Sequence, residues 1–92
     1  RSLYLDQNPL QSIAPTAFKS LVNLVTLSLN NCKLTQINFL AGMRALQKIY
    51  MGGNCITVVR NGDFKGCSSL RKIDLEDNPI KVIEQDAFKS LA

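Results

Sequence analysis

Apolar residues along this chain follow a spacing that fits neither one helix nor one strand. In residues 70–83, LRKIDLEDNPIKVI, they are spaced by three, then by two, and beyond an Asn-Pro pair by two and three again. A helix requires a spacing of about 3.6, and a half-buried strand a spacing of about 2. Residues 3–13, LYLDQNPLQSI, show the same pattern with the Asn-Pro pair in the same place. The pattern therefore indicates a repeated unit.

The chain divides into about four such units when it is aligned on the asparagines. The expected boundaries are 1–23, 24–45, 46–69 and 70–92, within one domain. Leu46 to Leu70 spans 24 residues, but Leu24 to Leu46 spans only 22. Register is kept as far as Ile37, so the two missing residues fall after it, where a surface turn can absorb the loss.

Each unit is expected to contribute one short strand, because the centre of its pattern alternates with period two. The expected strands lie near Leu3–Leu5, Leu27–Leu29, Ile49–Met51 and Ile73–Leu75. Units that repeat one path place these strands in a parallel sheet, about 4.8 Å apart. The return path of each unit is bulkier than a strand, so the stack should bend with the sheet on its concave side.

Asparagine recurs where each strand turns into the return path, at Asn8, Asn54 and Asn78. A buried amide must find hydrogen-bond partners, so these side chains are expected to bond backbone groups of their own coil and the next. Cys32 takes this position in the second unit. A thiol is a weak donor, and the sequence therefore predicts a local gap in the asparagine ladder.

Two further columns concern the return side. Phe18, Phe64 and Phe88 share a position and are expected to form a packing spine there. Cys67 falls in an apolar column and should be a buried free thiol. Cys55 shares its column with prolines and a lysine, so it should be exposed, either as an inert thiol or as a point of covalent attachment.

The consensus of the units, LxxLxLxxNxLxxIxxxxFxxL, resembles the leucine-rich repeat, in particular the typical 24-residue subclass of animal extracellular proteins such as Toll-like receptors. The resemblance covers the whole chain. It implies an α/β fold, a right-handed curved solenoid with irregular or 3-10 turns on its convex face. Residues 64–70, FKGCSSL, also faintly resemble bacterial surface-antigen repeats. The Cys-rich caps of extracellular members are missing, so we expect an internal fragment of a longer array.

The amino-acid composition argues against several classes of function. Histidine is absent, which removes the commonest acid–base catalyst and metal ligand, and three widely spaced cysteines make a poor zinc site. We therefore expect no enzyme activity, no cofactor and no metal. The net charge is +4, but Lys and Arg are scattered singly, which argues against nucleic acid. No apolar stretch reaches membrane-spanning length, so a membrane would be reached only through segments outside this chain.

Binding is expected on the concave face, where the outward side chains of the strands are not needed for packing of the core. A tyrosine beside Gly52-Gly53 makes a good contact anchor, and basic and acidic residues lie at opposite ends of the last strand. The candidate site comprises Tyr4, Ser28, Lys48, Tyr50, Arg71, Lys72, Asp74 and Glu76. The alternative is a solvated face with no partner in this segment.

These features favour a non-catalytic segment of an extracellular or cell-surface receptor or adhesion protein that recognises a protein or peptide ligand. The extracellular or cell-surface location is inferred only from the resemblance to this subclass of repeat. The alternative reading is a set of structural spacer repeats, or an intracellular scaffold of the same fold. Uncapped repeats expose an apolar edge, so a dimer or larger assembly is compatible with the sequence.

Overall fold

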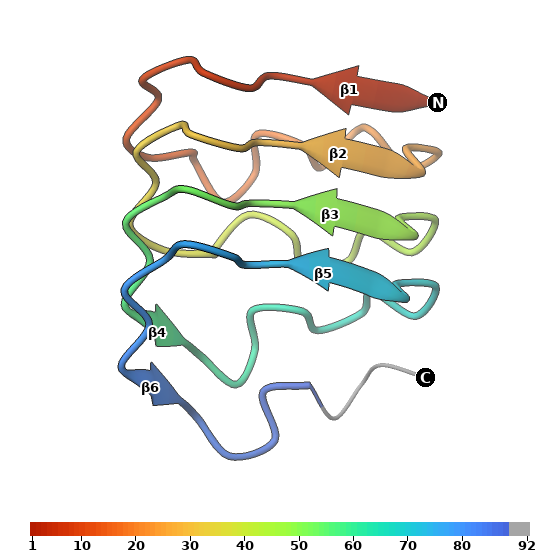
Figure 1. Ribbon diagram of the computed structural model, residues 1–92. Coiled ribbons are helices and arrows are strands. Elements are labelled where there is room, and N and C mark those ends of the chain that lie inside the picture. Colours follow the sequence, from red (N-terminus) through yellow and green to blue (C-terminus); the bar gives the residue numbers. More distant parts are fainter. Residues whose placement is uncertain (89–92) are drawn as a thin grey trace.

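The period-two centres of the repeats form a parallel sheet in the computed structural model, which describes residues 1–88 (Figure 1). The sheet has the order β1-β2-β3-β5, and its strands are β1 (Ser2–Tyr4), β2 (Thr26–Ser28), β3 (Lys48–Tyr50) and β5 (Lys72–Asp74). Leu3, Leu27, Ile49 and Ile73 face one another in register at the strand centres. The predicted parallel sheet is therefore confirmed.

Each strand begins and ends one residue earlier than expected. The two-residue alternation is unchanged, because the central residue of each strand points into the core. The backbone pairing nevertheless continues past the strands, since Leu29 N donates to Tyr50 O at 2.7 Å and Met51 N to Asp74 O at 2.8 Å. Leu5 N likewise donates to Ser28 O at 2.8 Å, so the same ladder holds the second inward residue of each of the first three repeats.

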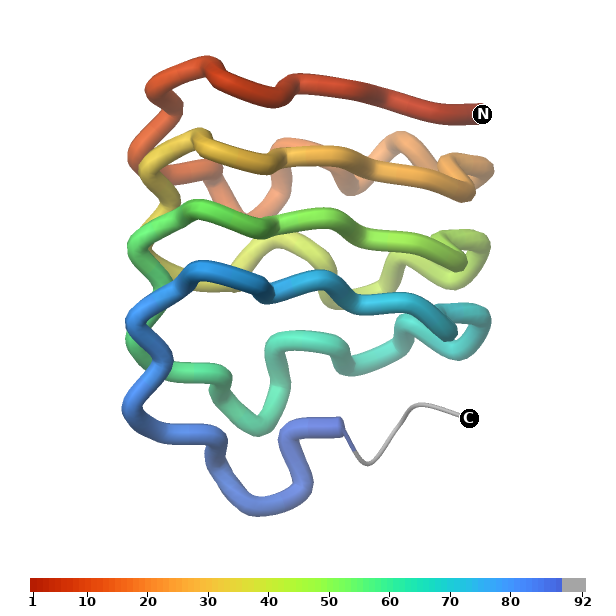
Figure 2. Tube along the Cα trace, in the orientation of Figure 1, coloured from red at the N-terminus to blue at the C-terminus, as the bar shows by residue number. Residues whose placement is uncertain are grey.

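The coils advance in a right-handed sense, from the strand in front to the return path behind it (Figure 1). The strand sides of successive coils superimpose closely, whereas the return paths differ in shape from coil to coil (Figure 2). Curvature of the stack, with the sheet on the concave side, stays a prediction.

The return side is more regular in the third and fourth repeats than expected. Two short strands, β4 (Val58–Val59) and β6 (Val82–Ile83), pair in parallel there as a second sheet. Elsewhere the return segments consist of irregular chain and turns, and residues 1–88 contain no helix. The irregular turns are thus confirmed for the first two repeats, and β-branched residues at adjacent return positions give strands in the last two.

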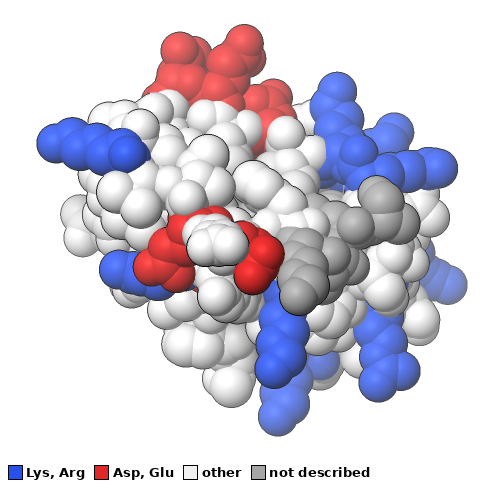
Figure 3. Space-filling view, turned by 90° about the horizontal axis from the view of Figure 1, so that it is seen from below, with Lys and Arg blue, Asp and Glu red and all other residues white. Residues whose placement is uncertain are grey.

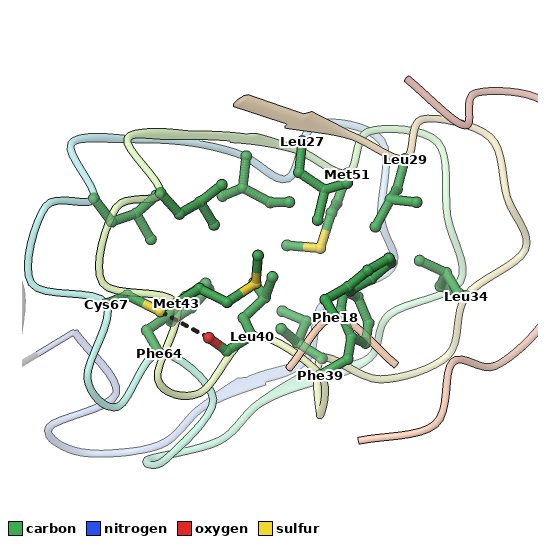
Figure 4. Close-up of a cluster of buried hydrophobic side chains, with 14 of the residues drawn as sticks. Phe18, Leu27, Leu29, Leu34, Phe39, Leu40, Met43, Met51, Phe64 and Cys67 are labelled. Atoms are coloured by element: carbon green, nitrogen blue, oxygen red, sulfur yellow. Dashed lines mark hydrogen bonds between the residues drawn. The ribbon is translucent and has the colours of Figure 1, made fainter. Parts of the chain in front are cut away.

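The core lies between the strands and the return side, where Leu27, Leu29, Met51 and Phe64 are all fully buried (Figure 4). The end coils are more open: Leu3, Leu5, Ile73 and Leu75 are only partly buried. This difference follows from stacking, because a middle coil is covered on both sides and an end coil on one.

The aromatic spine holds for two of its three predicted members. Phe18 and Phe64 are buried, but Phe88 is 39% exposed because it lies on the last coil, where it stacks on Phe64 with ring centroids 5.6 Å apart. In the second repeat, Leu40 occupies the position equivalent to Phe18 and Phe64. The adjacent Phe39, which the pattern did not single out, is buried edge-to-face against Phe18 at 5.9 Å. The packing spine therefore includes a ring outside the repeat consensus.

The asparagine ladder is confirmed most clearly at Asn54. Its Nδ2 donates to the carbonyl oxygens of Leu29 and Met51, both at 2.9 Å. Its Oδ1 accepts from the backbone N–H groups of Cys32 at 2.9 Å and Leu34 at 3.0 Å. One buried side chain thus ties the second coil to the third.

The gap predicted at Cys32 is only half present. Cys32 Sγ donates to Leu5 O at 3.1 Å, as an asparagine Nδ2 would. The acceptor side is missing: Leu10 N bonds instead to Asn8 O at 2.7 Å, in a tight three-residue turn. A thiol therefore replaces the donor half of the ladder and leaves the acceptor half to a local turn.

The two missing residues of the second repeat are absorbed on the return side, as predicted. Gly42 N donates to Lys65 O at 2.8 Å, so this turn is fastened to the third repeat. A Cβ on Gly66 would lie 3.1 Å from Gly42 Cα, which shows how closely the two turns approach. Strand register is unaffected, because β2 and β3 still pair residue for residue.

Cys67 is a buried free thiol and Cys55 is exposed, as predicted, and Cys32 is a buried free thiol as well. Burial raises the pKa of the Cys67 thiol above its ordinary value, and its Sγ donates to Leu40 O at 3.1 Å (Figure 4). Leu91, expected in the same column, lies outside the described residues.

Candidate functional site

The candidate site lies on the outward side of the four-stranded sheet, here called the strand face. Tyr4 is 66% exposed, and Lys48, Arg71, Lys72 and Glu76 are exposed as expected. Tyr50 and Asp74 are half-buried and in register with each other across β3 and β5. The structure therefore brings together the residues of the last two strands and leaves Tyr4 at the far end of the sheet.

Ser28 was expected to be free for binding, and this expectation is wrong. Its side chain is only 3% exposed, and its Oγ donates to Asp6 Oδ1 at 2.6 Å. The same carboxylate oxygen accepts from Asn30 N at 2.9 Å. Ser28 thus joins the first two coils, because a short hydroxyl beside a carboxylate is better satisfied by the fold than by solvent.

The basic end of the strand face is built around Tyr50. Lys48 and Lys72 are paired in register on adjacent strands, and Lys72 Nζ lies 5.8 Å from the centroid of the Tyr50 ring. This distance is within the range of a cation–π contact. Arg71 Nη2 donates to Gln47 Oε1 at 3.0 Å. The half-buried Tyr50 ring therefore lies beside a positive charge.

The acidic end follows the strand exits. Asp74 Oδ1 accepts from Glu76 N at 3.0 Å, which fixes the turn that presents Glu76 and Asp77. A shallow hollow of about 200 Å³ lies beside them and is lined by Asn30, Asn31, Gly52, Gly53, Asp74, Glu76 and Asp77. Sequence reasoning noted these strand exits but left the asparagines and Asp77 out of the site. Their equivalent positions in the repeats could have identified them, because equivalent residues of successive repeats lie side by side in a parallel stack.

The backbone at the exits has one recurring conformation. Gln7, Asn31, Gly53 and Asp77 occupy one column, and all have positive φ, of 64°, 59°, 69° and 59°. Only the third coil uses glycine there, and a Cβ on Gly53 would collide with the Asn31 side chain. Glycine at position 53 therefore makes room for the Asn31 side chain of the preceding coil, which lies directly over its backbone.

Charge is segregated along the strand direction. Viewed from below, basic and acidic side chains gather in separate clusters along the strand face, at the top of the picture (Figure 3). Lys72 and Glu76 are four residues apart, which corresponds to roughly 13 Å at the rise of an extended strand. The strand face therefore presents a positive end, a tyrosine and a negative end in that order.

No group of three or more His, Cys, Asp or Glu within residues 1–88 is placed to hold a metal ion. Burial raises the pKa of the Asp63 carboxyl, against the lowering effect of a hydrogen bond from Arg60 N, but Asp63 lies on the return side. The described part of the chain contains no apolar helix long enough to cross a membrane.

The chain is similar to several proteins with leucine-rich repeats, two of which are named as receptors. The chain is 38% identical over 76 residues to leucine-rich repeat-containing protein 4B of Mus musculus, covering 83% of this chain and 11% of that protein. It is 36% identical over 90 residues to leucine-rich repeat-containing G-protein coupled receptor 5 of Rattus norvegicus, covering 98% and 10%. It is 40% identical over 48 residues to Toll-like receptor 2 of Cricetulus griseus, covering 52% and 6%.

The chain thus spans about a tenth of the length of the first two of these relatives. The leucine rich repeat family model matches residues 1–56, 38–80 and 52–92, which together cover the whole sequence. These matches agree with the stacked parallel strands and the asparagine ladder, so the chain belongs to the leucine-rich repeat family.

Proposed function

We propose that this chain is a non-catalytic recognition segment of a cell-surface receptor and that it binds a protein or peptide ligand through its strand face. The observation that carries the proposal is the contact of Tyr50 with Lys72, which has Lys48 beside it at the basic end, while the acidic turn lies at the other end. Tyrosine and charged groups in a defined order give a surface both contact area and orientation.

Two of the relatives are named as receptors, which supports an extracellular or cell-surface location for the protein that contains this segment. The segment would act without metal or cofactor, since its charges are carried by side chains of one face. A ligand of complementary polarity would place carboxylates over Lys48, Arg71 and Lys72 and basic groups over Asp74, Glu76 and Asp77.

The test begins with the intact protein carrying a photo-crosslinking amino acid at position 50, or at position 65 on the return side as the control. A ligand that crosslinks from position 50 is purified, and its affinity is measured for the Y50A, K72E and E76K variants. We expect each to bind at least tenfold more weakly, which corresponds to about 1.4 kcal/mol. K65E, on the return side, should bind normally.

The alternative is that these repeats are a structural spacer. Unchanged affinity in Y50A, K72E and E76K, with crosslinks from position 65 only, would favour that alternative and overturn the strand-face proposal. Salt dependence gives an additional readout, because a ligand held by exposed charges should bind less tightly as ionic strength rises.

A further inference from the structure

A second hollow lies away from the strand face, where the return segments of the first two coils approach the next strands. Its volume is about 590 Å³, within the range of roughly 300–1,000 Å³ that is typical of ligand pockets. Phe18, Lys19 and residues 21–23 of the first repeat form one wall, and residues 41–44 of the second form the other. None of the strand-face residues lines it.

The hollow results from the short second repeat. That repeat lacks two return-side residues, and its remaining turn is fastened to the third repeat by the hydrogen bond from Gly42 N to Lys65 O. The turn is therefore drawn toward the third coil, and space is left beside the first. Phe39 fills part of this region from inside through its contact with Phe18.

The apolar wall is more exposed than the repeat pattern requires. Val22 is 63% exposed and Leu21 is 38% exposed. The residues equivalent to Val22 in the next two repeats are Arg44 and Ser68, both polar, so the column itself does not call for an apolar side chain. Phe18 and Met43 continue the same wall inward.

The charge at this hollow has one sign. Lys19 and Arg44 both line it, and no carboxylate does. Arginine binds a carboxylate through two parallel hydrogen bonds, and lysine supplies a second point charge. Two cations on an apolar wall match a ligand that carries an aliphatic side chain flanked by at least two carboxylates.

We propose that this hollow is a second binding site, which takes an acidic peptide segment of a partner protein. The peptide would pack an aliphatic side chain against Val22 and Met43 and place carboxylates at Lys19 and Arg44. A single-chain fatty acid fits less well, because it has one carboxylate for two cations. The site does not depend on the strand face, and a partner could occupy both.

The third repeat supplies matched controls. Lys65 stands in the same column as Lys19, and Ser68 in the same column as Val22. All four are exposed. Lys81 is also exposed on the return side, so K65E/K81E changes the net charge by the same amount as K19E/R44E.

The experiment uses the intact protein and three fluorescein-labelled probes, with binding followed by anisotropy. The probes are the acidic peptide Glu-Asp-Leu-Glu-Glu, its basic counterpart Lys-Lys-Leu-Lys-Lys, and an acidic peptide with Ser in place of Leu. We expect the first to bind, and the serine peptide to bind at least fivefold more weakly. K19E/R44E should lose the acidic peptide at least tenfold and gain the basic one, which also shows that the variant is folded.

V22R should weaken binding of the acidic leucine peptide by covering the apolar wall, whereas S68R and Y50A should not. An equal loss in K65E/K81E would indicate general attraction to a basic chain and would overturn the proposal. Binding of decanoate without binding of any peptide would overturn the peptide assignment in favour of a fatty acid. A loss in Y50A alone would move the peptide to the strand face.

Discussion

The second and third repeats have the same strand and the same register, yet they differ in almost everything else. The third has a full 24 residues, a buried asparagine and a buried phenylalanine in the spine, whereas the second has 22 residues, Cys32 and Leu40 at the equivalent positions. The strands nevertheless pair residue for residue. The comparison shows that the strand side tolerates no change in length, while the return side absorbs it.

The reason is the kind of contact on each side. Strand pairing consists of backbone hydrogen bonds, and a one-residue slip would turn every inward side chain to solvent. The return side depends on a few turns and on the packing of side chains. Where one repeat leaves space there, a neighbouring side chain can fill it. Phe39 does so in the second repeat, where it packs against Phe18.

The largest effect is expected at the ladder residue of the third repeat. Asn54→Ala removes hydrogen bonds to Leu29, Met51, Cys32 and Leu34 and leaves their backbone groups buried without partners. Each unsatisfied group costs about 1–3 kcal/mol, partly relieved by water, so we expect a loss of about 5 kcal/mol in the free energy of unfolding. Chemical denaturation measures it.

Asn8→Ala is the matched control. Asn8 is exposed, and among residues 1–88 its side chain bonds only Leu5 O and Asp6 O of its own coil, so a loss of about 1 kcal/mol or less is expected. Equal losses in the two variants would show that the ladder contributes through local turns and not through its links between coils.

The next effect concerns the spine. Phe64→Ala should cost about 4 kcal/mol, because its ring is fully buried and its removal leaves a cavity. Phe88→Ala should cost clearly less, since that ring is 39% exposed. Both are measured by chemical denaturation, and a larger loss at Phe88 would mean that the last coil is covered in a way the described residues do not show.

A smaller effect, of opposite sign, is expected when the second repeat is made more like the third. Cys32→Asn would supply an acceptor for Leu10 N, which now bonds to Asn8 O. The amide differs little from the thiol in volume, so we expect a gain of about 1 kcal/mol in the free energy of unfolding. Destabilisation by this variant would contradict the inference that the acceptor half of the ladder is missing.

The smallest effect concerns pH on the return side of the third repeat. Burial raises the pKa of Asp63, so the folded chain binds its proton more tightly than the unfolded chain does. The stabilisation from this group is therefore complete below the ordinary Asp pKa of about 3.9 and is lost as pH rises through the higher folded value. Asp63→Asn keeps an oxygen to accept from Arg60 N.

The stability of Asp63→Asn relative to the unmodified chain should accordingly rise as pH increases from acid to neutral, as denaturation at several pH values would show. An advantage of Asp63→Asn that is greatest in acid would contradict the direction of the pKa shift.

The site was predicted less completely than the fold. Lys48, Tyr50, Lys72 and Asp74 follow from strand alternation and adjoin as expected. Ser28 follows from the same alternation but is buried, because Asp6 of the preceding coil accepts its hydroxyl. No sequence motif predicts the hollow beside Val22. Strand alternation predicts whether a side chain leaves the backbone toward the core or toward solvent. It does not predict the hydrogen-bond partners of that side chain, which belong to other coils.

The sequence by itself predicted the spacing of the repeats, the parallel pairing, the buried columns and the place where two residues are missing. These follow from periodicity, because each coil must cover the apolar side of its neighbour. Only the tertiary structure decided the short strands β4 and β6, the burial of Phe39 and the turn of Gly42 toward the third repeat. Those features depend on which neighbour fills the space that one coil leaves, and such contacts between coils have no period along the chain.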